Sequence, residues 1–142
     1  MVTRTLDLTV EAWELAVSRL PPDAPVPDWS MRGAFHAITR TPRELSIVCA
    51  AASVPADVRS EKGWRCLTVA GPIAFEETGV LASVAAPLAE AGIGVFAIAT
   101  FDTDYVLVPG RKLEPALRAL EAAGHRIIPR RGTTIAKPDR RR

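Results

Sequence analysis

The segment at residues 96–108 constrains this chain most, because two apolar runs flank a short polar stretch there. The runs at 96–99 and 105–108 are rich in β-branched, aromatic and other apolar residues, which is typical of strands. The stretch between them holds Thr100, Asp102, Thr103 and Asp104, which is more polar chemistry than a tight turn requires. We therefore expect a β-hairpin whose connection serves a function.

The charge balance argues against a nucleic-acid-binding protein. The formal net charge of the 142 residues is +2, but Arg140, Arg141 and Arg142 supply +3 at the very end, so the other 139 residues carry 2 − 3 = −1. The remaining basic residues are scattered, whereas nucleic-acid binding needs them gathered on one face. We expect residues 131–142 to form a basic, disordered tail, with an electrostatic tether as the alternative.

Hydrophobic residues make up 48% of the chain, which is enough for a real core. Cys49 and Cys66 each lie in an apolar run, where a free thiol behaves as a small hydrophobe, so we do not expect a disulfide framework. The first residues lack the apolar core of a signal peptide, and no apolar run approaches the roughly 20 residues of a membrane span. We expect a cytoplasmic protein without a membrane partner.

The first half of the chain predicts an irregular unit over residues 1–61. Residues 5–10 alternate as a half-buried strand does, and 12–20 fit a helix and a strand equally well. Prolines then enforce a loop, after which strands are expected at 34–40 and 45–49, joined by a turn at 41–44. The alanine-rich and charged stretch that follows predicts a short helical turn and a connector.

The second half is more regular and predicts a unit over residues 62–130. Strands are expected at 65–70, 93–99, 105–108 and 125–128, with helices at 79–91 and 113–123. Thr78 is the expected N-cap of the first helix, Gly92 and Gly124 should follow the helix ends, and Pro87 should bend the first helix. This βαββαβ order predicts a four-stranded antiparallel sheet with both helices on one face, the ferredoxin-like arrangement of α+β proteins.

Several segments of the second half, taken together, carry a resemblance to a known family. These segments are Gly71-Pro72-Ile73, residues 78–85, residues 86–93 and residues 100–108. They resemble the ACT domain of bacterial double-ACT regulatory proteins, which are similar to the ACT modules of lysine-sensitive aspartokinases and of an animal cytosolic arginine sensor. Residues 34–49 resemble the divergent N-terminal ACT-like unit of the same proteins. The resemblance implies two tandem ferredoxin-like ACT units, the first of them divergent.

The resemblance implies a regulatory protein that binds an amino acid and has no catalytic activity. The ligand carboxylate needs free backbone N–H groups, as at a helix N-terminus, and its ammonium needs an acidic side chain. In the arginine sensor, the positions matching Thr100, Phe101 and Asp104 line the amino-acid pocket. The alternatives are that Thr78 is a simple cap and that Asp102 or Asp104 is a simple turn residue. The expected ligand-binding residues are Ile73, Glu76, Thr78, Gly79, Thr100, Phe101, Asp102 and Asp104.

Other functions find less support in the sequence. His36 and His125 lack partners at metal-ligand spacing, Ser83 lies in no nucleophile motif, and no phosphate-binding loop follows a strand, so we expect no metal, cofactor or catalysis. An RNA-recognition module shares the βαββαβ order, but residues 93–99 carry no Lys or Arg. A protein-interaction module with a decayed pocket is the main alternative.

The expected partners follow from the same resemblance and from the open edge of a lone ACT sheet. We expect a homodimer through the C-terminal ACT units, because side-by-side pairing would bury that edge and give two equivalent ligand sites. A regulated protein acting in trans is a further possible partner.

Overall fold

The computed structural model describes residues 5–74 and 77–129. Glu76 and the expected basic tail lie outside the described residues. The chain divides into two compact units. The main unit comprises the described parts of Met1–Ala12 and Arg65–Arg142, and the small unit comprises Trp13–Trp64. Residues at the start of the chain thus group with its second half, whereas we expected a boundary at residues 61 and 62.

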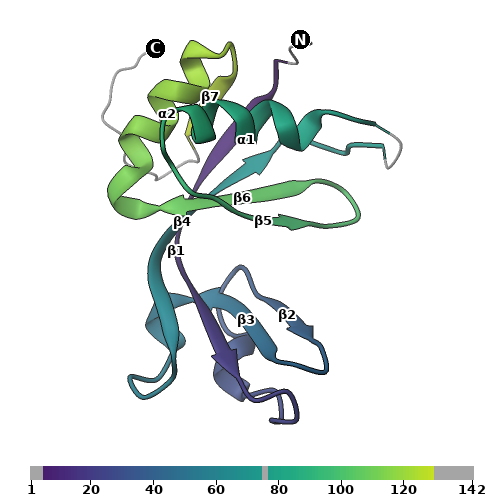
Figure 1. Cartoon of the computed structure of the whole chain (residues 1–142), viewed down its shortest axis with the longest axis vertical. Helices are drawn as coiled ribbons and strands as arrows, with labels where there is room; N and C mark the ends of the chain where they lie inside the picture. The colour runs from purple at the N-terminus through teal and green to yellow at the C-terminus, as the bar shows by residue number, and fades with distance from the viewer. Residues whose placement is uncertain (1–4, 75–76, 130–142) are drawn as a thin grey trace. The chain divides into compact units, whose positions relative to one another are not determined.

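The main unit contains the predicted βαββαβ sequence (Figure 1). Its elements are β4 (Ser60–Val69), α1 (Val80–Glu90), β5 (Phe96–Ala99), β6 (Asp104–Pro109), α2 (Leu113–Ala122) and β7 (Arg126–Pro129), with a 3₁₀ turn at Gly110–Lys112 before α2. Both helices cover the same face of the sheet, as predicted for a ferredoxin-like fold.

The sheet of the main unit differs from the expected four strands by one addition. The first part of β1 (Asp7–Leu20) lies between β4 and β7, so the strand order is β5-β6-β4-β1-β7. β1 pairs in parallel with β7, from Asp7 opposite Arg126 to Val10 opposite Pro129. The physical reason is burial, because Leu8 and Val10 alternate along β1 and both side chains are fully buried in the core of this unit.

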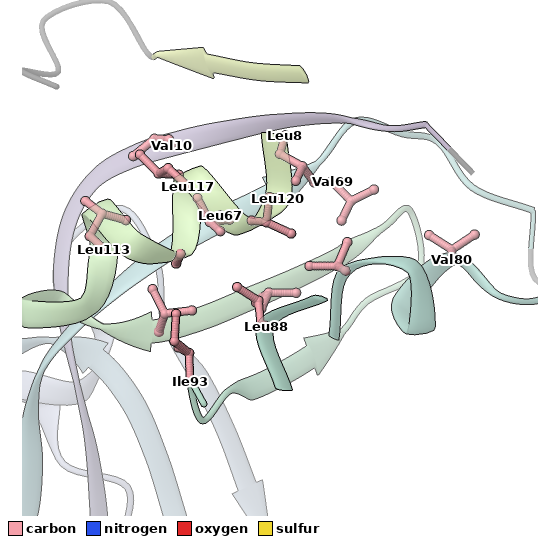
Figure 2. Packing of buried hydrophobic residues seen from close by; sticks show 14 residues of the cluster. Leu8, Val10, Leu67, Val69, Val80, Leu88, Ile93, Leu113, Leu117 and Leu120 are labelled. Atoms are coloured by element: carbon pink, nitrogen blue, oxygen red, sulfur yellow. The ribbon is translucent and has the colours of Figure 1, made fainter. Parts of the chain in front are cut away.

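The core of the main unit lies between the sheet and the two helices (Figure 2). Alternate residues of β1, β4 and β6 point into it, as the period of two in a strand requires. The helices contribute residues at spacings of three and four, as amphipathic helices do. The buried members are Leu8, Val10, Leu67, Val69, Val80, Val84, Leu88, Ile93, Val106, Val108, Leu113, Ala116, Leu117 and Leu120.

The small unit consists of strands and short 3₁₀ helices. The second part of β1 pairs antiparallel with β3 (Leu45–Ala50), and β3 pairs antiparallel with β2 (Ala37–Arg40). Residues 12–20, which fitted a helix and a strand equally well, therefore belong to a strand. The 3₁₀ helices span Asp28–Met31 and Ala51–Ser53. The expected turn before β3 is confirmed: the Thr41 hydroxyl oxygen accepts hydrogen bonds from the N–H groups of Arg43 and Glu44.

Both cysteines are free and buried, which makes their thiols unreactive in the folded protein. Burial raises the pKa of Cys49, and burial raises the pKa of Cys66 to about 12, with the nearby Glu11 carboxylate adding to the rise. Since the thiolate is the reactive species, we expect iodoacetamide at pH 8 to label neither cysteine in native protein and both in urea, as read by mass spectrometry.

The same pKa shifts set the direction of a pH effect on stability. An unfolded thiol loses its proton near pH 8.5, whereas the folded thiols keep theirs at higher pH. The unfolded state therefore binds fewer protons above that pH, and the free energy of unfolding should fall as the solution becomes more alkaline. Rapid labelling of native protein would contradict this account of both cysteines.

Candidate functional site

A pocket of about 400 Å³ lies in the main unit where the connection before α1 meets the β5–β6 hairpin. Its volume falls within the range of small-molecule sites. The connection, the first turn of α1 and the hairpin each contribute to its wall. The lining residues are Ile73, Ala74, Glu77, Gly79, Val80, Leu81, Ala82, Ala99, Thr100, Phe101, Thr103 and Asp104.

The hairpin turn that forms one wall is built by the two threonines of the polar stretch. The Thr100 N–H and hydroxyl both donate to the Thr103 carbonyl oxygen at 2.8 Å, and the Thr103 N–H reaches back to the Thr100 hydroxyl at 3.3 Å. The buried Thr103 hydroxyl donates to the Val69 carbonyl at 2.5 Å, which ties the turn to β4. The prediction of a hairpin at 96–108 is thus confirmed, with Ala99 opposite Asp104 as its last pair.

The connection after β4 is held directly against this turn. The Ile73 N–H donates to the Asp102 carbonyl oxygen at 2.7 Å. Gly71 comes so close that a Cβ atom there would lie 2.9 Å from the same Asp102 oxygen and 3.1 Å from the Cβ of Thr103. Only glycine fits at this distance from another backbone, so Gly71 sets the spacing between the two walls.

The third wall is the N-terminus of α1. Gly79 is the N-cap residue with φ of 80°, in the left-handed region that favours glycine, and no side chain caps this helix. The prediction that Thr78 is the N-cap is therefore wrong. The N-cap lies one residue later, at Gly79, whose left-handed backbone conformation a threonine would adopt only at a cost. The first N–H groups of any α-helix have no acceptor within the helix, so this turn offers donors to an anionic group.

The structure brings five of the eight predicted site residues together around the pocket. These are Ile73, Gly79, Thr100, Phe101 and Asp104.

Three predicted residues are not among those lining the pocket. Thr78 and Asp102 are exposed and do not line it, and Asp102 contributes only its carbonyl oxygen to the bond with Ile73. Glu76 lies outside the described residues. A ligand contact for any of these residues stays a prediction.

Sequence reasoning missed Glu77 and the apolar lining from the start of α1. Glu77 is exposed and follows Glu76, so the acidic pair before the helix was the available signal. Val80 is buried and Leu81 is 38% exposed. Helical periodicity assigns such residues to a core face, and only the three-dimensional position of the hairpin makes them a pocket wall.

The described lining of the pocket is acidic and apolar. Glu77 and the half-buried Asp104 are its two carboxylates, and no described lining residue is Lys, Arg or His. Phe101 is 77% exposed at the rim and provides an aromatic surface. This arrangement suits a ligand with a cationic group beside a carboxylate and some apolar surface.

Metal ligation finds no support in the part of the chain that the structure describes. Within residues 5–74 and 77–129, no cluster of three or more His, Cys, Asp or Glu side chains could hold a metal ion. None of the helices in these same ranges is long and apolar enough to cross a membrane.

Comparison with known proteins agrees with this fold. A family model described as the ACT domain matches residues 59–122. Residues 59–122 therefore belong to the ACT domain family. A second family model, which describes an N-terminal domain, matches residues 14–57, close to the extent of the small unit. The ACT match covers β4, both helices and the hairpin, so the candidate pocket lies within the ACT domain.

Three known proteins illustrate what this chain is similar to. A crystal structure of an Agobacterium tumefaciens protein is 40% identical, with a TM-score of 0.86 over 90% of this chain and 96% of the other. The bovine protein named cytosolic arginine sensor for mTORC1 subunit 1 is 34% identical over 62% of this chain. The ligand-free regulatory subunit of aspartate kinase from Thermus thermophilus is 12% identical, with a TM-score of 0.59 over 82% of this chain and 96% of the other, and shows the fold alone.

The matched part covers only 29% of the bovine sensor's own length. What that sensor does as a whole protein therefore reaches this chain only as a proposal.

Proposed function

We propose that this ACT protein is a non-catalytic sensor that binds a free amino acid in the pocket between α1 and the β5–β6 hairpin. One observation carries the proposal: the N-terminus of α1 and the Asp104 carboxylate line the same pocket of about 400 Å³. An amino acid presents a carboxylate and an ammonium a few atoms apart, so a single site needs both kinds of partner.

The two ends of the pocket have complementary roles in this proposal. The ligand carboxylate accepts hydrogen bonds from first-turn N–H groups of α1, where the helix dipole also favours negative charge. Asp104 and Glu77 attract the cationic group, and Phe101 with Leu81 covers the aliphatic part. The bovine relative is named an arginine sensor, which supports an amino acid as the ligand class.

The test is a thermal-shift screen of the twenty amino acids with the full chain. A ligand that binds only the folded state stabilises it by about 2.7 kcal/mol at 100 times its dissociation constant, so the melting temperature should rise for a small subset of amino acids. Isothermal titration of those amino acids should then give one site per chain. No shift with any of the twenty would overturn the proposal.

A protein-interaction module is the second candidate, because Phe101 is 77% exposed at the tip of the hairpin. An exposed aromatic ring is a common anchor of protein interfaces. The two candidates separate by experiment, since a pure interaction module should bind its partner equally well with and without amino acids. Both candidate functions are compatible with a separate protein that this chain regulates.

We expect the protein to form a homodimer through the sheet edge at β5. Within the described residues β5 is the last strand in the order and pairs with β6. Exposed strand edges attract further pairing, and Val95 and Phe101 expose apolar surface close to this strand. Light scattering of the full chain at micromolar concentration should give twice the mass of one chain, and a strict monomer would contradict this prediction.

A further inference from the structure

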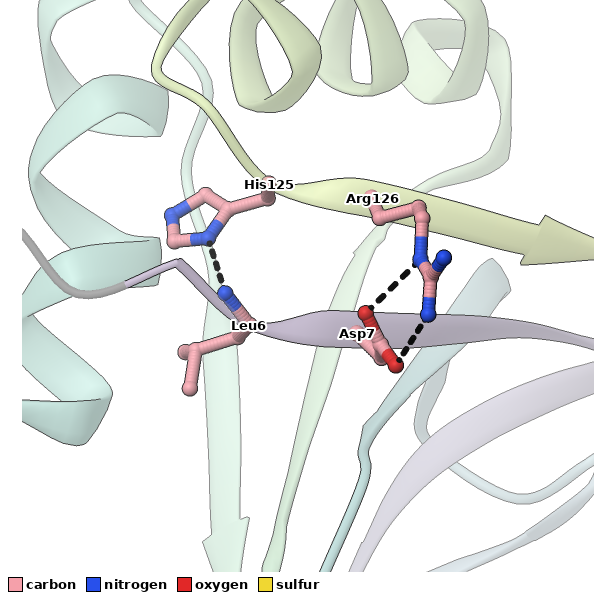
Figure 3. Close-up of polar contacts among 4 residues, drawn as sticks. All are labelled: Leu6, Asp7, His125 and Arg126. Atoms are coloured by element: carbon pink, nitrogen blue, oxygen red, sulfur yellow. Dashed lines mark hydrogen bonds and ion pairs between the residues drawn. The ribbon is translucent and has the colours of Figure 1, made fainter.

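His125 is buried just before β7, and both nitrogens of its ring are engaged. Nδ1 lies 3.1 Å from the Leu6 backbone nitrogen (Figure 3), and Nε2 lies 2.8 Å from the Ser83 carbonyl oxygen. The Leu6 N–H can only donate and the Ser83 oxygen can only accept, so Nδ1 is the acceptor and Nε2 carries the proton. The ring is therefore the neutral Nε2–H tautomer, and it joins the chain just before β1 to α1.

The Ser83 carbonyl needs this outside donor because of Pro87. In a regular helix the carbonyl of residue 83 accepts the N–H of residue 87, four positions later. Pro87 lies inside α1 and has no N–H, and a proline ring also clashes with the carbonyl four residues before it. The Ser83 carbonyl therefore lacks its usual helix hydrogen bond and needs a donor from elsewhere. The Nε2–H group of His125 supplies the missing bond.

Ser83 lies directly after the residues of α1 that line the pocket. Val80, Leu81 and Ala82 line the pocket and Ser83 follows them. Ser83 donates its N–H at 3.0 Å and its hydroxyl at 2.7 Å to the carbonyl oxygen of the N-cap Gly79. A continuous series of hydrogen bonds therefore runs from Gly79, a lining residue, through Ser83 and His125 to Leu6.

We propose that His125 is a positioning residue for the pocket. Its Nε2–H group replaces the helix hydrogen bond that Pro87 cannot make, and this bond holds the first turn of α1 in the orientation that binds the ligand. The role of the pocket in this proposal rests on the proposed function above, whereas the replacement of the helix bond does not.

Two substitutions of His125 separate its two hydrogen bonds. The side-chain oxygen of His125→Asn can take the place of Nδ1 and keep the bond from Leu6, but it leaves Ser83 without a donor. The amide group of His125→Gln can take the place of Nε2 and keep the bond to Ser83, but it leaves Leu6 without an acceptor. Pro87→Ala restores an N–H at position 87, which can satisfy the Ser83 carbonyl from within the helix.

The experiment places each His125 variant in the native and in the Pro87→Ala background. His125→Asn should speed hydrogen exchange of the Ser83 amide by about tenfold in the native background. In the Pro87→Ala background the same change should speed it by less than about twofold, because the helix then supplies its own bond. His125→Gln should have the same effect in both backgrounds. Equal effects of His125→Asn in both backgrounds would overturn the proposal.

A ligand measurement then tests the positioning role, with whichever amino acid the screen identifies. His125→Asn should raise its dissociation constant by about tenfold, and the added Pro87→Ala should return it to within about twofold of the native value, a rescue that follows the helix bond. An unchanged dissociation constant in His125→Asn would overturn the positioning role.

The outcomes also separate this proposal from the proposed function. If no amino acid binds, the proposed function fails, and the positioning role fails with it. The exchange experiment on unliganded protein still decides whether His125 replaces the helix bond. Long-range proton–nitrogen NMR of the ring should show the Nε2–H tautomer, and the Nδ1–H tautomer would overturn the assignment of the bond.

Discussion

Asp104→Asn is expected to weaken amino-acid binding by about tenfold to a hundredfold and to leave the melting temperature of the unliganded protein nearly unchanged. Asp104 is half-buried at the start of β6 and lines the pocket beside the exposed ring of Phe101. A hydrogen bond to a charged group contributes about 1.5–3 kcal/mol, and 1.4 kcal/mol corresponds to one decade in affinity. The substitution keeps the shape of the side chain and removes only its charge.

The measurement is isothermal titration beside a melting curve, with Asp102→Asn as the matched control. Asp102 lies two residues away in the same turn, and its side chain is exposed and does not line the pocket. If only lining side chains bind the ligand, this variant should keep native affinity, whereas weakened binding would support the predicted ligand contact of Asp102. If Asp104→Asn also binds with native affinity but melts lower, Asp104 is a structural turn residue and the assignment of its role is wrong.

Gly71→Ala is expected to reduce both stability and binding. The added Cβ would lie 2.9 Å from the Asp102 carbonyl oxygen, which is backbone and cannot rotate away. The connection and the hairpin must then separate, which strains the hydrogen bond from the Ile73 N–H to that oxygen. Overpacking of this kind costs about 1–3 kcal/mol, and a displaced hairpin should also weaken the ligand contacts.

Gly94→Ala provides the control for this substitution. A Cβ atom at Gly94 meets no other heavy atom within 4 Å, and the backbone there is not in the left-handed region. Urea unfolding should place Gly94→Ala within about 0.5 kcal/mol of the native protein, and titration should show unchanged affinity. If Gly71→Ala is equally neutral, the close approach of the connection to the hairpin does not control the pocket.

Much of the ACT domain could be predicted from local sequence patterns. The helix expected at 79–91 is α1 at Val80–Glu90, and the helix expected at 113–123 is α2 at Leu113–Ala122. Gly92 and Gly124, expected after the helix ends, have φ of 76° and 103°. These elements were predictable because helical periodicity and glycine conformation depend on residues a few positions apart.

The candidate site was predictable only where its residues are neighbours in sequence. Thr100, Phe101 and Asp104 lie in one turn and were found together. Glu77 and Leu81 line the pocket because the start of α1 faces that turn, which no local pattern reports. Thr78 was mistaken for the helix cap because capping preferences are statistical, and here a left-handed Gly79 takes that position.

The sequence by itself determined the elements of the main unit, the βαββαβ order and the polar turn of the hairpin, because each depends on interactions between residues close in the chain. The tertiary structure decided what β1 does: its first part lies between β4 and β7, and its second part pairs with β3. The tertiary structure also buries Glu11, whose carboxylate accepts a hydrogen bond from the Thr68 hydroxyl at 2.7 Å. Strand partners and buried polar groups depend on residues far apart in the chain, so only the folded arrangement specifies them.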